Sequence, residues 1–483
     1  MTTKIPMLDL MFFLTETQDS PRHVGSVLIF KRPARSRPGL VQEIVDAYRA
    51  STPAAPFNQV PVFPRVGLPY WQAVDSIDMN HHIFHLALPS PGSDEQLHQL
   101  IADLHGPMFE RHRPGWKVYF IEGLKENRFA IYHKVHHALV DGESGMEILR
   151  RSLSTSASSR KIPSTFGTRL SATRREVPEE MRSMLERQAR KLARQTRSVG
   201  LGSARVLQDA IEGLKGFSVR QKRAFTAPDT PMNRPIYNAR SLTHRVFSLP
   251  AIKSVARAYG ATLNDVALCM LDAGVQRYLS EMGESPDHPL VCLVPVSLRD
   301  AGADQATTQV SAIWPALGPV QAPIDQRLKA IMKSTDEAKA QLRDLGKDAA
   351  YAYAVVTFAV SETLAVASPG ILGMRPANML ISNVRGSDKP LYLNGARLEA
   401  LFPTSTLIVG LGLNVTLLSY DDKVILGFMA NGAALPEIES LGNYTEEAFG
   451  DLRQSIIRKA DKPRSRAKRS KAKKKPTRPR KKR

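Results

Sequence analysis

Two adjacent histidines, followed at a fixed spacing by aspartate and glycine, form the part of this sequence best suited to acid–base chemistry. The segment reads His136-His137-Ala-Leu-Val-Asp141-Gly142. An imidazole has a pKa near neutrality and can take a proton from a hydroxyl in a transition state, which typically contributes ~10²–10⁴-fold in rate. Gly142 would permit a tight turn, and Asp141 could orient the loop by accepting a hydrogen bond or by pairing with an arginine. The arrangement favours a general base at this position.

The same residue types also have structural explanations. Asp141 could be the N-cap of the helix expected after it, with Glu143 favourable in the first turn, and for Asp141 taken alone this explanation is preferred. Paired histidines are not specific, because His81-His82 is followed by His85 and by no Asp-Gly. We interpret that pair as structural. The spacing of the three histidines would allow a zinc site, but no cysteine or acidic cluster supports one.

The motif must be positioned by the elements on either side of it. Residues 129–135 are strand-like and end at the histidine pair, and residues 143–149 are compatible with a helix. Elsewhere in the first third of the chain the predicted elements are a strand at 25–30 and helices at 39–50 and 94–105. We expect residues 1–155 to form an α/β domain that carries the motif.

A second segment of mixed patterning covers residues 237–460. The elements predicted there are helices at 249–259 and 264–279 and strands at 290–296, 405–418 and 424–429. Between the two segments, residues 156–236 are rich in Ser, Arg, Lys and Gln, and the helical stretch at 179–197 has a thin apolar face. This favours a solvated helix bridging two domains over a helix lying on an anionic membrane surface. The sequence therefore predicts two α/β domains joined by a basic helical linker.

Length and composition agree with a two-domain protein of a reducing compartment. The 483 residues exceed one ordinary core, and 42% hydrophobic with 23% charged residues is a globular composition. A membrane span needs about eighteen uninterrupted apolar residues, and no run in the sequence is that long. The N-terminal stretch contains Lys4, Pro6 and Asp9, whereas the apolar part of a secretory leader should be uncharged. Cys269 and Cys292 lie in apolar surroundings, which favours buried thiols over a disulfide or metal site. We expect a cytoplasmic protein that is not integral to a membrane.

Most of the positive charge lies at the C-terminus. Residues 462–483 hold 14 Lys or Arg and no acid, which is two thirds of the formal net charge of +21. We predict a disordered basic tail over residues 461–483, since it is proline-interrupted and has nothing to bury. An anionic membrane or lipid inclusion is the favoured partner, at ~1 kcal/mol per basic residue near the surface. Nucleic acid is not expected, because no base-stacking aromatic accompanies the tail, and a merely solubilising tail is the remaining alternative.

The HHxxxDG combination resembles the signature of the superfamily that includes chloramphenicol acetyltransferase, carnitine acyltransferases and peptide-synthetase condensation domains. Within that superfamily the sequence resembles the bacterial wax ester synthase/acyl-CoA:diacylglycerol acyltransferase family along nearly its whole length. Further stretches carry the resemblance in order: Phe109-Glu-Arg-His-Arg113-Pro114-Gly115-Trp116 (the family's LDRxRPLW), Thr262-Leu-Asn264-Asp265 (its ND motif), Pro295-Val-Ser297-Leu-Arg299 (its PVSxR) and Leu411-Gly-Leu-Asn-Val-Thr with Ser419-Tyr420 (its late strands).

Three positions depart from the family pattern. Gly115 stands in place of a leucine, Thr307-Thr308 in place of the usual Gly-Asn, and Arg385 in place of a proline. None of these positions lies in the segment that contains His137. They bear on local loop geometry and substrate preference and leave the reaction class unchanged.

The resemblance implies a fold and a mechanism. The implied fold is α/β, with two chloramphenicol acetyltransferase-like domains and a substrate tunnel at their interface. His137 would take the proton from an alcohol as its oxygen attacks an acyl-CoA thioester, and donors for the resulting oxyanion would be Asn264 or, less directly, Ser405. Acyl-CoA would be the co-substrate, and neither a metal nor a prosthetic group is required.

Several roles stay open at this point. Asn264 could be a helix cap instead of a donor. Arg299 could pair with Asp141, bind a phosphate of acyl-CoA, or be an ordinary surface residue, and Ser297 is grouped with it as an acyl-CoA or structural residue. His136 is expected to support the motif. The apolar segment 349–359 suits a buried helix better than the wall of a lipid pocket.

The predicted function is an O-acyltransferase that makes wax esters from long-chain fatty alcohols and triacylglycerol from diacylglycerol, using acyl-CoA as donor. The alternatives are a related enzyme with a different alcohol or amine acceptor, and a catalytically silent lipid-binding protein. The intact His137, Asp141 and Gly142 argue against silence. The predicted location is cytoplasmic, peripheral to the inner face of the membrane or to lipid bodies.

Overall fold

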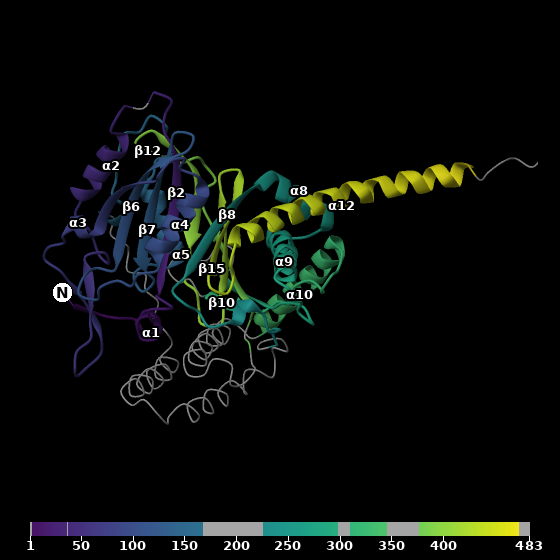
Figure 1. Cartoon of the computed structure of the whole chain (residues 1–483), viewed down its shortest axis with the longest axis horizontal. Helices are drawn as coiled ribbons and strands as arrows, with labels where there is room; N and C mark the ends of the chain where they lie inside the picture. The colour runs from purple at the N-terminus through teal and green to yellow at the C-terminus, as the bar shows by residue number, and fades with distance from the viewer. Residues whose placement is uncertain are drawn as a thin grey trace, which may run out of the picture.

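The computed structural model describes residues 2–35, 37–167, 226–297, 310–344, 375 and 377–472. The linker helix predicted at 179–197, the apolar segment 349–359, and the side chains of Ser297 and Arg299 lie outside the described part. Within it, the strands form two six-stranded sheets and a small three-stranded one, and helices cover the outer faces (Figure 1).

The first sheet carries the histidine motif and runs in the order β12-β13-β2-β7-β6-β5. Its strands are β2 (His23–Lys31), β5 (Ile83–Ala87), β6 (Trp116–Leu124), β7 (Arg128–His136), β12 (Tyr392–Leu393) and β13 (Ala396–Thr404). The helices of this half are α1 (Met7–Thr15), α2 (Leu40–Arg49), α3 (Met79–His82), α4 (Asp94–His105) and α5 (Gly142–Ser152). The small sheet, in the order β1-β4-β3, consists of β1 (Thr2–Lys4), β3 (Gln59–Val62) and β4 (Tyr70–Ala73).

The second sheet runs in the order β10-β9-β11-β14-β15-β8. Its strands are β8 (Arg240–Ser248), β9 (Cys292–Ser297), β10 (Val310–Ile313), β11 (Met379–Arg385), β14 (Leu413–Tyr420) and β15 (Lys423–Asn431). Its helices are α8 (Leu249–Tyr259), α9 (Leu263–Glu281), α10 (Ile324–Asp344) and α12 (Ile438–Ala472). Short 3₁₀ turns occur at Thr165–Gly167 and Pro231–Asn233.

A strand from the second half of the chain completes the first sheet. β13 pairs antiparallel with β2, with Thr404 opposite Gly25, and it also runs against β14 and β15 of the second sheet. Gly25 is required at this crossing, because a Cβ there would lie 2.3 Å from the carbonyl oxygen of His133 and 2.6 Å from Oγ1 of Thr404. β13 therefore joins the two sheets around a shared core.

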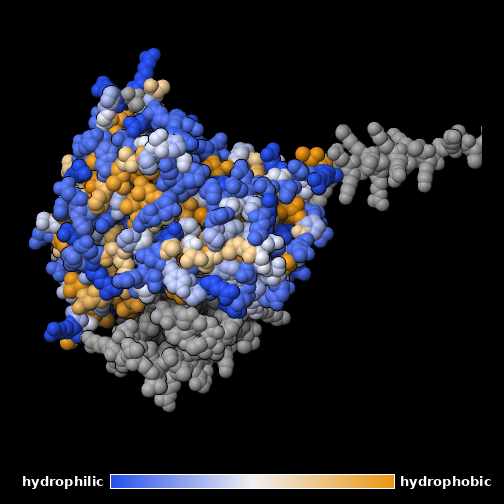
Figure 2. Space-filling view, viewed as in Figure 1, coloured by the Kyte–Doolittle hydropathy of each residue, from blue (hydrophilic) through white to orange (hydrophobic). Residues whose placement is uncertain are grey.

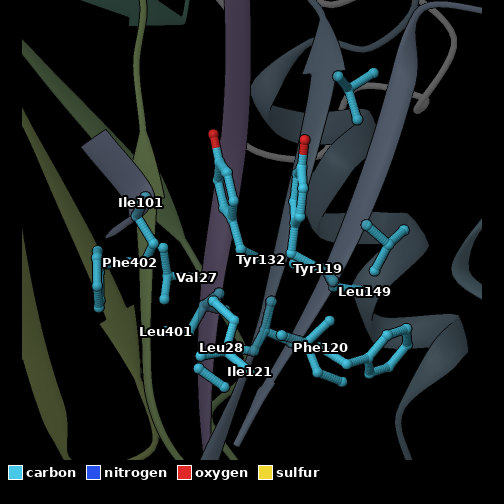
Figure 3. Packing of buried hydrophobic residues seen from close by; sticks show 14 of the residues in the cluster. Val27, Leu28, Ile101, Tyr119, Phe120, Ile121, Tyr132, Leu149, Leu401 and Phe402 are labelled. Atoms are coloured by element: carbon cyan, nitrogen blue, oxygen red, sulfur yellow. The ribbon is translucent and has the colours of Figure 1, made fainter. Parts of the chain in front are cut away.

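The core behind the motif is built from leucine, β-branched and aromatic side chains, and nearly every residue of β7 is buried in it. Figure 3 shows Tyr119 and Tyr132 side by side on β6 and β7, with their hydroxyl groups pointing the same way, and their rings are 5.8 Å apart. Ile101 of α4 and Phe402 of β13, labelled in the same view, belong to the same buried cluster. Burial of this apolar surface, at roughly 25 cal/mol per Å², holds the ends of β7 and β2 in place.

The α4–β8 contact also links the two halves of the molecule. His98 Nε2 lies 2.8 Å from Nδ1 of His244, and the ring of His244 stacks on Phe402 at 4.3 Å. His98 Nδ1 is 3.9 Å from a carboxylate oxygen of Glu439 at the start of α12. His98 is buried and His244 is half-buried, and burial lowers the pKa of both rings, so the junction depends on neutral rings.

Most predicted elements of the described part are confirmed within a few residues. The helices expected at 39–50, 94–105, 249–259 and 264–279 correspond to α2, α4, α8 and α9, each of which has a clear N-terminal start signal in sequence or a strong apolar stripe. The single strand expected at 405–418 is wrong. β13 ends at Thr404 and β14 begins at Leu413, because a turn closed by Leu411 N–H donating to the Ile408 carbonyl, with Gly410 at φ +81°, separates them.

The C-terminal tail also differs from its prediction at its beginning. α12 continues to Ala472, so residues 461–472 are helical where disorder was predicted from residue 461. Adding residues to an existing helix is easy compared with starting one, and basic residues near a helix C-terminus interact favourably with its dipole. The helix extends away from the body of the molecule (Figure 1). Among the helices of the described part, none combines the length and apolar character that crossing a membrane requires.

Candidate active site

His137 lies directly after the C-terminal end of β7, which is an inner strand of the first sheet. Its backbone N–H donates to the carbonyl of Arg22 at 2.8 Å, so the start of β2 fixes the position of the turn. Its ring stacks on Phe12 of α1, with centroids 4.3 Å apart and planes at 10°. The side chain is half-buried, and its Nδ1 atom is buried. His137 therefore follows the end of a strand, as the sequence predicted.

The surroundings of His137 favour its neutral form. Burial lowers the pKa of His137 below its usual range, because the charged ring would lose its hydration. The carbonyls of His137 and Val140 and the carboxylate of Asp141 act in the opposite direction, and the neighbouring His136 acts with burial. The net effect is a lowered pKa, which leaves an imidazole able to accept a proton at neutral pH.

Both ring nitrogens of His136 have partners within the fold. Its Nδ1 accepts a hydrogen bond from the Ala138 N–H at 3.2 Å, so the neutral ring carries its proton on Nε2. Nε2 lies 3.2 Å from a carboxylate oxygen of Glu16 and donates to it. The ring stacks on Phe13 at 4.2 Å. This matches the expectation that His136 supports the motif.

Glu16 is a site residue that the sequence analysis missed. Its buried carboxylate binds both His136 and Arg111, the latter at 2.8 Å, and so connects the end of α1 to the LDRxRPLW-like element. Burial would raise the pKa of Glu16, but the hydrogen bonds and charges of His136 and Arg111 outweigh it and lower the pKa. A single acidic residue in the N-terminal segment carries no signal that could have singled it out.

Gly115, which departs from the family pattern, packs against the motif. A Cβ at this position would lie 3.0 Å from the Cβ of His136, and Leu139 would be 3.6 Å away. A cavity of about 20 Å³, the size of one water molecule, adjoins it. It is lined by Phe13, Glu16, Trp71, Arg111, His136 and Leu139, among others. Gly115 therefore leaves room behind His136 that a larger residue would occupy.

Asp141 and Gly142 open helix α5. Asp141 is its N-cap, and its side chain accepts from the backbone N–H of Ser144 at 2.8 Å, so the structural explanation holds for it. Gly142 is the first helical residue, without a positive φ, and a Cβ there would meet only Val384 at 3.9 Å. The expectation that Gly142 makes a tight turn through its conformational freedom is wrong, because the chain enters the helix with ordinary dihedral angles.

Asn264 lies in the first turn of α9 but does not cap it. The cap is Thr262, which forms a reciprocal capping box with Asp265, and Asp265 also accepts from Thr335 at 2.8 Å. The amide of Asn264 is half-buried, and its Oδ1 accepts from Nδ2 of Asn383 on β11 at 2.6 Å. The cap alternative for Asn264 is therefore wrong, and Asn383 is its partner.

β11 lies near both candidate segments. Asn383 of β11 pairs with Asn264, and the next residue, Val384, lies 3.9 Å from where a Cβ at Gly142 would be. Ser405 is half-buried and its hydroxyl lies 2.9 Å from that of Thr416. Ser297 ends β9, paired in register with Val310. The pairing of Arg299 with Asp141 stays a prediction.

His82, interpreted from the sequence as structural, and His133 on β7 both have partners within the fold. His82 Nδ1 is 2.7 Å from the Trp116 carbonyl, the ring stacks on Trp116, and burial lowers the pKa of His82 to about 4. His133 is buried between Ser26 and Thr165. No cluster of three potential metal ligands occurs among the described residues.

Comparison with known proteins agrees with this geometry. The family model described as the wax ester synthase/diacylglycerol acyltransferase catalytic domain matches residues 6–267, and the C-terminal domain of the same family matches residues 308–453. A putative diacylglycerol O-acyltransferase of Mycobacterium tuberculosis is 35% identical over 92% of this chain and 96% of its own length. The O-acyltransferase WSD of Acinetobacter baylyi is 29% identical over 94% and 97%.

Solved structures give the same result for the fold. The wax ester synthase/diacylglycerol acyltransferase of Marinobacter aquaeolei superposes with a TM-score of 0.78 at 29% identity, covering 94% of this chain and 99% of that one. The first condensation domain of the calcium-dependent antibiotic synthetase superposes with a TM-score of 0.54 at 14% identity, which confirms the predicted chloramphenicol acetyltransferase-like α/β fold. The chain belongs to the wax ester synthase/diacylglycerol acyltransferase family and is an acyltransferase.

Proposed function

We propose that this acyltransferase moves a fatty acyl group from acyl-CoA to the hydroxyl of a long-chain alcohol or a diacylglycerol, with His137 as the general base. The products are a wax ester or a triacylglycerol and free CoA. The observation that carries the proposal is the half-buried His137, held at a strand end by Phe12 and Arg22, with a pKa that burial lowers. The relatives named as O-acyltransferases support the acceptor class.

In the proposed reaction, His137 takes the proton of the acceptor O–H as the oxygen attacks the thioester carbonyl carbon. A C–O bond forms and the carbonyl oxygen becomes an oxyanion. The tetrahedral intermediate then collapses with cleavage of the C–S bond, and the CoA thiolate receives the proton from the His137 imidazolium. A proton on the buried Nδ1 near the carbonyls of His137 and Val140 would leave Nε2 as the acceptor.

Asn264 is the proposed donor to the oxyanion. Asn383 occupies the Oδ1 of Asn264, which leaves the Nδ2 hydrogens of Asn264 available to donate elsewhere. Removal of one preorganised donor of this kind costs about 10²–10³ in kcat. Asn383 is then a positioning residue. Ser405 is a weaker candidate because its hydroxyl already has Thr416 as a partner.

Further roles follow from the family elements. Arg299 and Ser297 are proposed to hold acyl-CoA, with pairing of Arg299 to Asp141 as the alternative. His136 and Glu16 position the motif. The domain limits at residues 155 and 236 and the basic tail as an attachment to an anionic membrane or lipid inclusion are also proposals.

The assay combines purified protein, palmitoyl-CoA and either hexadecanol or a diacylglycerol, and it follows release of CoA and formation of neutral lipid. The unsubstituted protein should turn over with at least one acceptor, and His137→Ala should lose ~10²–10⁴-fold. His288→Ala is the matched control. His288 is exposed, belongs to no element of the motif, and has its Nε2 3.0 Å from the Thr226 carbonyl. Absence of turnover with both acceptors, or equal activity of His137→Ala, would contradict the proposal.

The tail is tested separately. Deletion of residues 462–483 removes 14 basic side chains and should weaken binding to vesicles that contain anionic phospholipid, most strongly at low salt, because the attraction is screened as ionic strength rises. Activity on detergent-solubilised substrate should remain. Vesicle binding that is unchanged by the deletion would reject the tail as an attachment.

A further inference from the structure

The loop between β3 and β4 exposes an unusual share of apolar side chains. Phe63, Val66 and Leu68 are 38%, 90% and 40% exposed, and they make up half of the six exposed large hydrophobic residues in the described part of the chain. The hairpin projects beside the N-terminus, below the body of the first half, in Figure 1. Figure 2 shows the mixed apolar and polar character of this face. An apolar group of this kind marks an interaction surface.

The composition of the hairpin favours a lipid surface as its partner. Residues 59–73 contain one cation, Arg65, and no acidic residue. Pro61 lies in β3, which is an edge strand of its sheet, and Pro64 and Pro69 flank the tip. Proline lacks the N–H that another protein's strand would need for pairing, so this edge is protected against strand addition. A basic residue among apolar ones suits phospholipid headgroups above an acyl layer.

The first residue of the hairpin tip contacts α1, the helix that packs on the histidine motif. The ring of Phe63 meets Phe13 edge to face at 5.7 Å, and Phe13 stacks on His136. The guanidinium of Arg111, bound to Glu16, lies 5.2 Å from the centre of the Phe63 ring. β1, which precedes α1, pairs with β4. The tip therefore has a fixed orientation relative to the candidate active site.

We propose that the tip formed by residues 63–69 inserts into a phospholipid surface and places the active site next to the lipid phase that holds its acceptor. The proposal rests on the proposed function, since it assigns where an apolar acceptor is taken up. Val66 and Leu68 enter the apolar layer, and Arg65 stays at the headgroups. Attachment by the tip is apolar and resists salt, in contrast to attachment by the basic tail.

The test uses the full chain and vesicles of phosphatidylcholine at high salt, where the tail contributes little. The double variant Val66→Asp/Leu68→Asp should bind about tenfold or more weakly, since burial of one large apolar side chain contributes on the order of a factor of ten. Ile457→Asp is the matched control, because Ile457 is 62% exposed on α12, and its binding should equal that of the unsubstituted protein. Equal binding of all three proteins, or equal weakening by Ile457→Asp, overturns the proposal.

A second variant does not depend on the tolerance of the tip for charge. Val66→Trp should show a blue shift of its emission when vesicles are added, measured against the unsubstituted protein with its three tryptophans. Emission that stays at the wavelength of an exposed tryptophan contradicts insertion.

Activity measurements separate this proposal from the proposed function. The double aspartate variant should keep turnover of detergent-solubilised hexadecanol and lose turnover of vesicle-held hexadecanol, whereas failure of the unsubstituted protein in detergent contradicts the reaction itself.

Discussion

At the scale of single residues, two adjacent histidines of one motif have different surroundings. The ring of His137 remains half-buried against Phe12, while His136 is enclosed by Phe13, Ala138 and Glu16. Because His136 is held in place, the turn that carries His137 has little freedom to move. A displacement of about 1 Å at a reacting group can cost on the order of 10²-fold in rate. The environment of His136 therefore acts on the chemistry through position.

Replacement of Glu16 tests this positioning role. Glu16→Ala should lower kcat by about 10–100-fold with a small change in KM, because His136 loses its hydrogen-bond partner and the turn before His137 loosens. Glu16→Gln should recover much of the activity, since its amide oxygen can still accept from Nε2 of His136. Steady-state kinetics of both variants give the comparison. A change confined to KM, or no recovery by glutamine, would contradict a positioning role.

The sequence predicted the residues of the motif but only part of their environment. His137 was expected after a strand, and the structure has it there. The partners Glu16 and Asn383 could not be predicted, because each depends on a contact between distant segments and neither residue type is distinctive. Gly142 was misjudged, since a glycine at a helix start needs no special dihedral angle.

At the scale of elements, the helices were predictable because their signals are local. The capping boxes of α4 and α9 and the apolar stripe of α2 are visible in the sequence. The destination of β13 was not predictable. Alternating side chains indicate a strand, but they do not say which sheet it joins, and this strand joins the sheet of the first half.

Gly25 tests the crossing of β13 over the first sheet. Gly25→Ala should destabilise the fold by about 1–3 kcal/mol or more, because its Cβ would overlap the His133 carbonyl and the Thr404 hydroxyl. Gly450→Ala is the matched control on α12, where a Cβ would meet nothing within 4 Å, and it should be neutral or stabilising. Denaturant unfolding measures both variants. Equal stability of the two would show that β13 is not held close to β2 and β7.

At the scale of the whole molecule, buried histidines make the fold dependent on pH. Burial lowers the pKa of His133 to about 3, and the pKa values of His23, His98, His105 and His244 are also lowered chiefly by burial. A lowered pKa means that the unfolded chain binds protons more readily than the folded one. The contribution of these neutral histidines to the free energy of unfolding is therefore fully present above the unfolded histidine pKa near 6.5. It is lost as the pH falls below that value.

The expected size of this effect can be measured. From pH ~7 to pH ~5 the free energy of unfolding should fall by about 2 kcal/mol for each fully buried neutral histidine, until the fold gives way. The α4–β8 junction with its His98–His244 pair should be an early site of opening, which hydrogen exchange can detect. A free energy of unfolding that is constant over this range would contradict neutral buried rings.

The central claim is that His137 is the base of acyl transfer, and the pH dependence of kcat/KM tests it most directly. With the pKa of His137 lowered, kcat/KM should stay level through neutral pH and fall only below the ordinary histidine value of 6.5. His137→Ala should lose ~10²–10⁴-fold and should lack this acid limb. An acid limb above 6.5 in the unsubstituted enzyme would contradict the claim. So would the same limb in His137→Ala over the pH range in which both proteins stay folded.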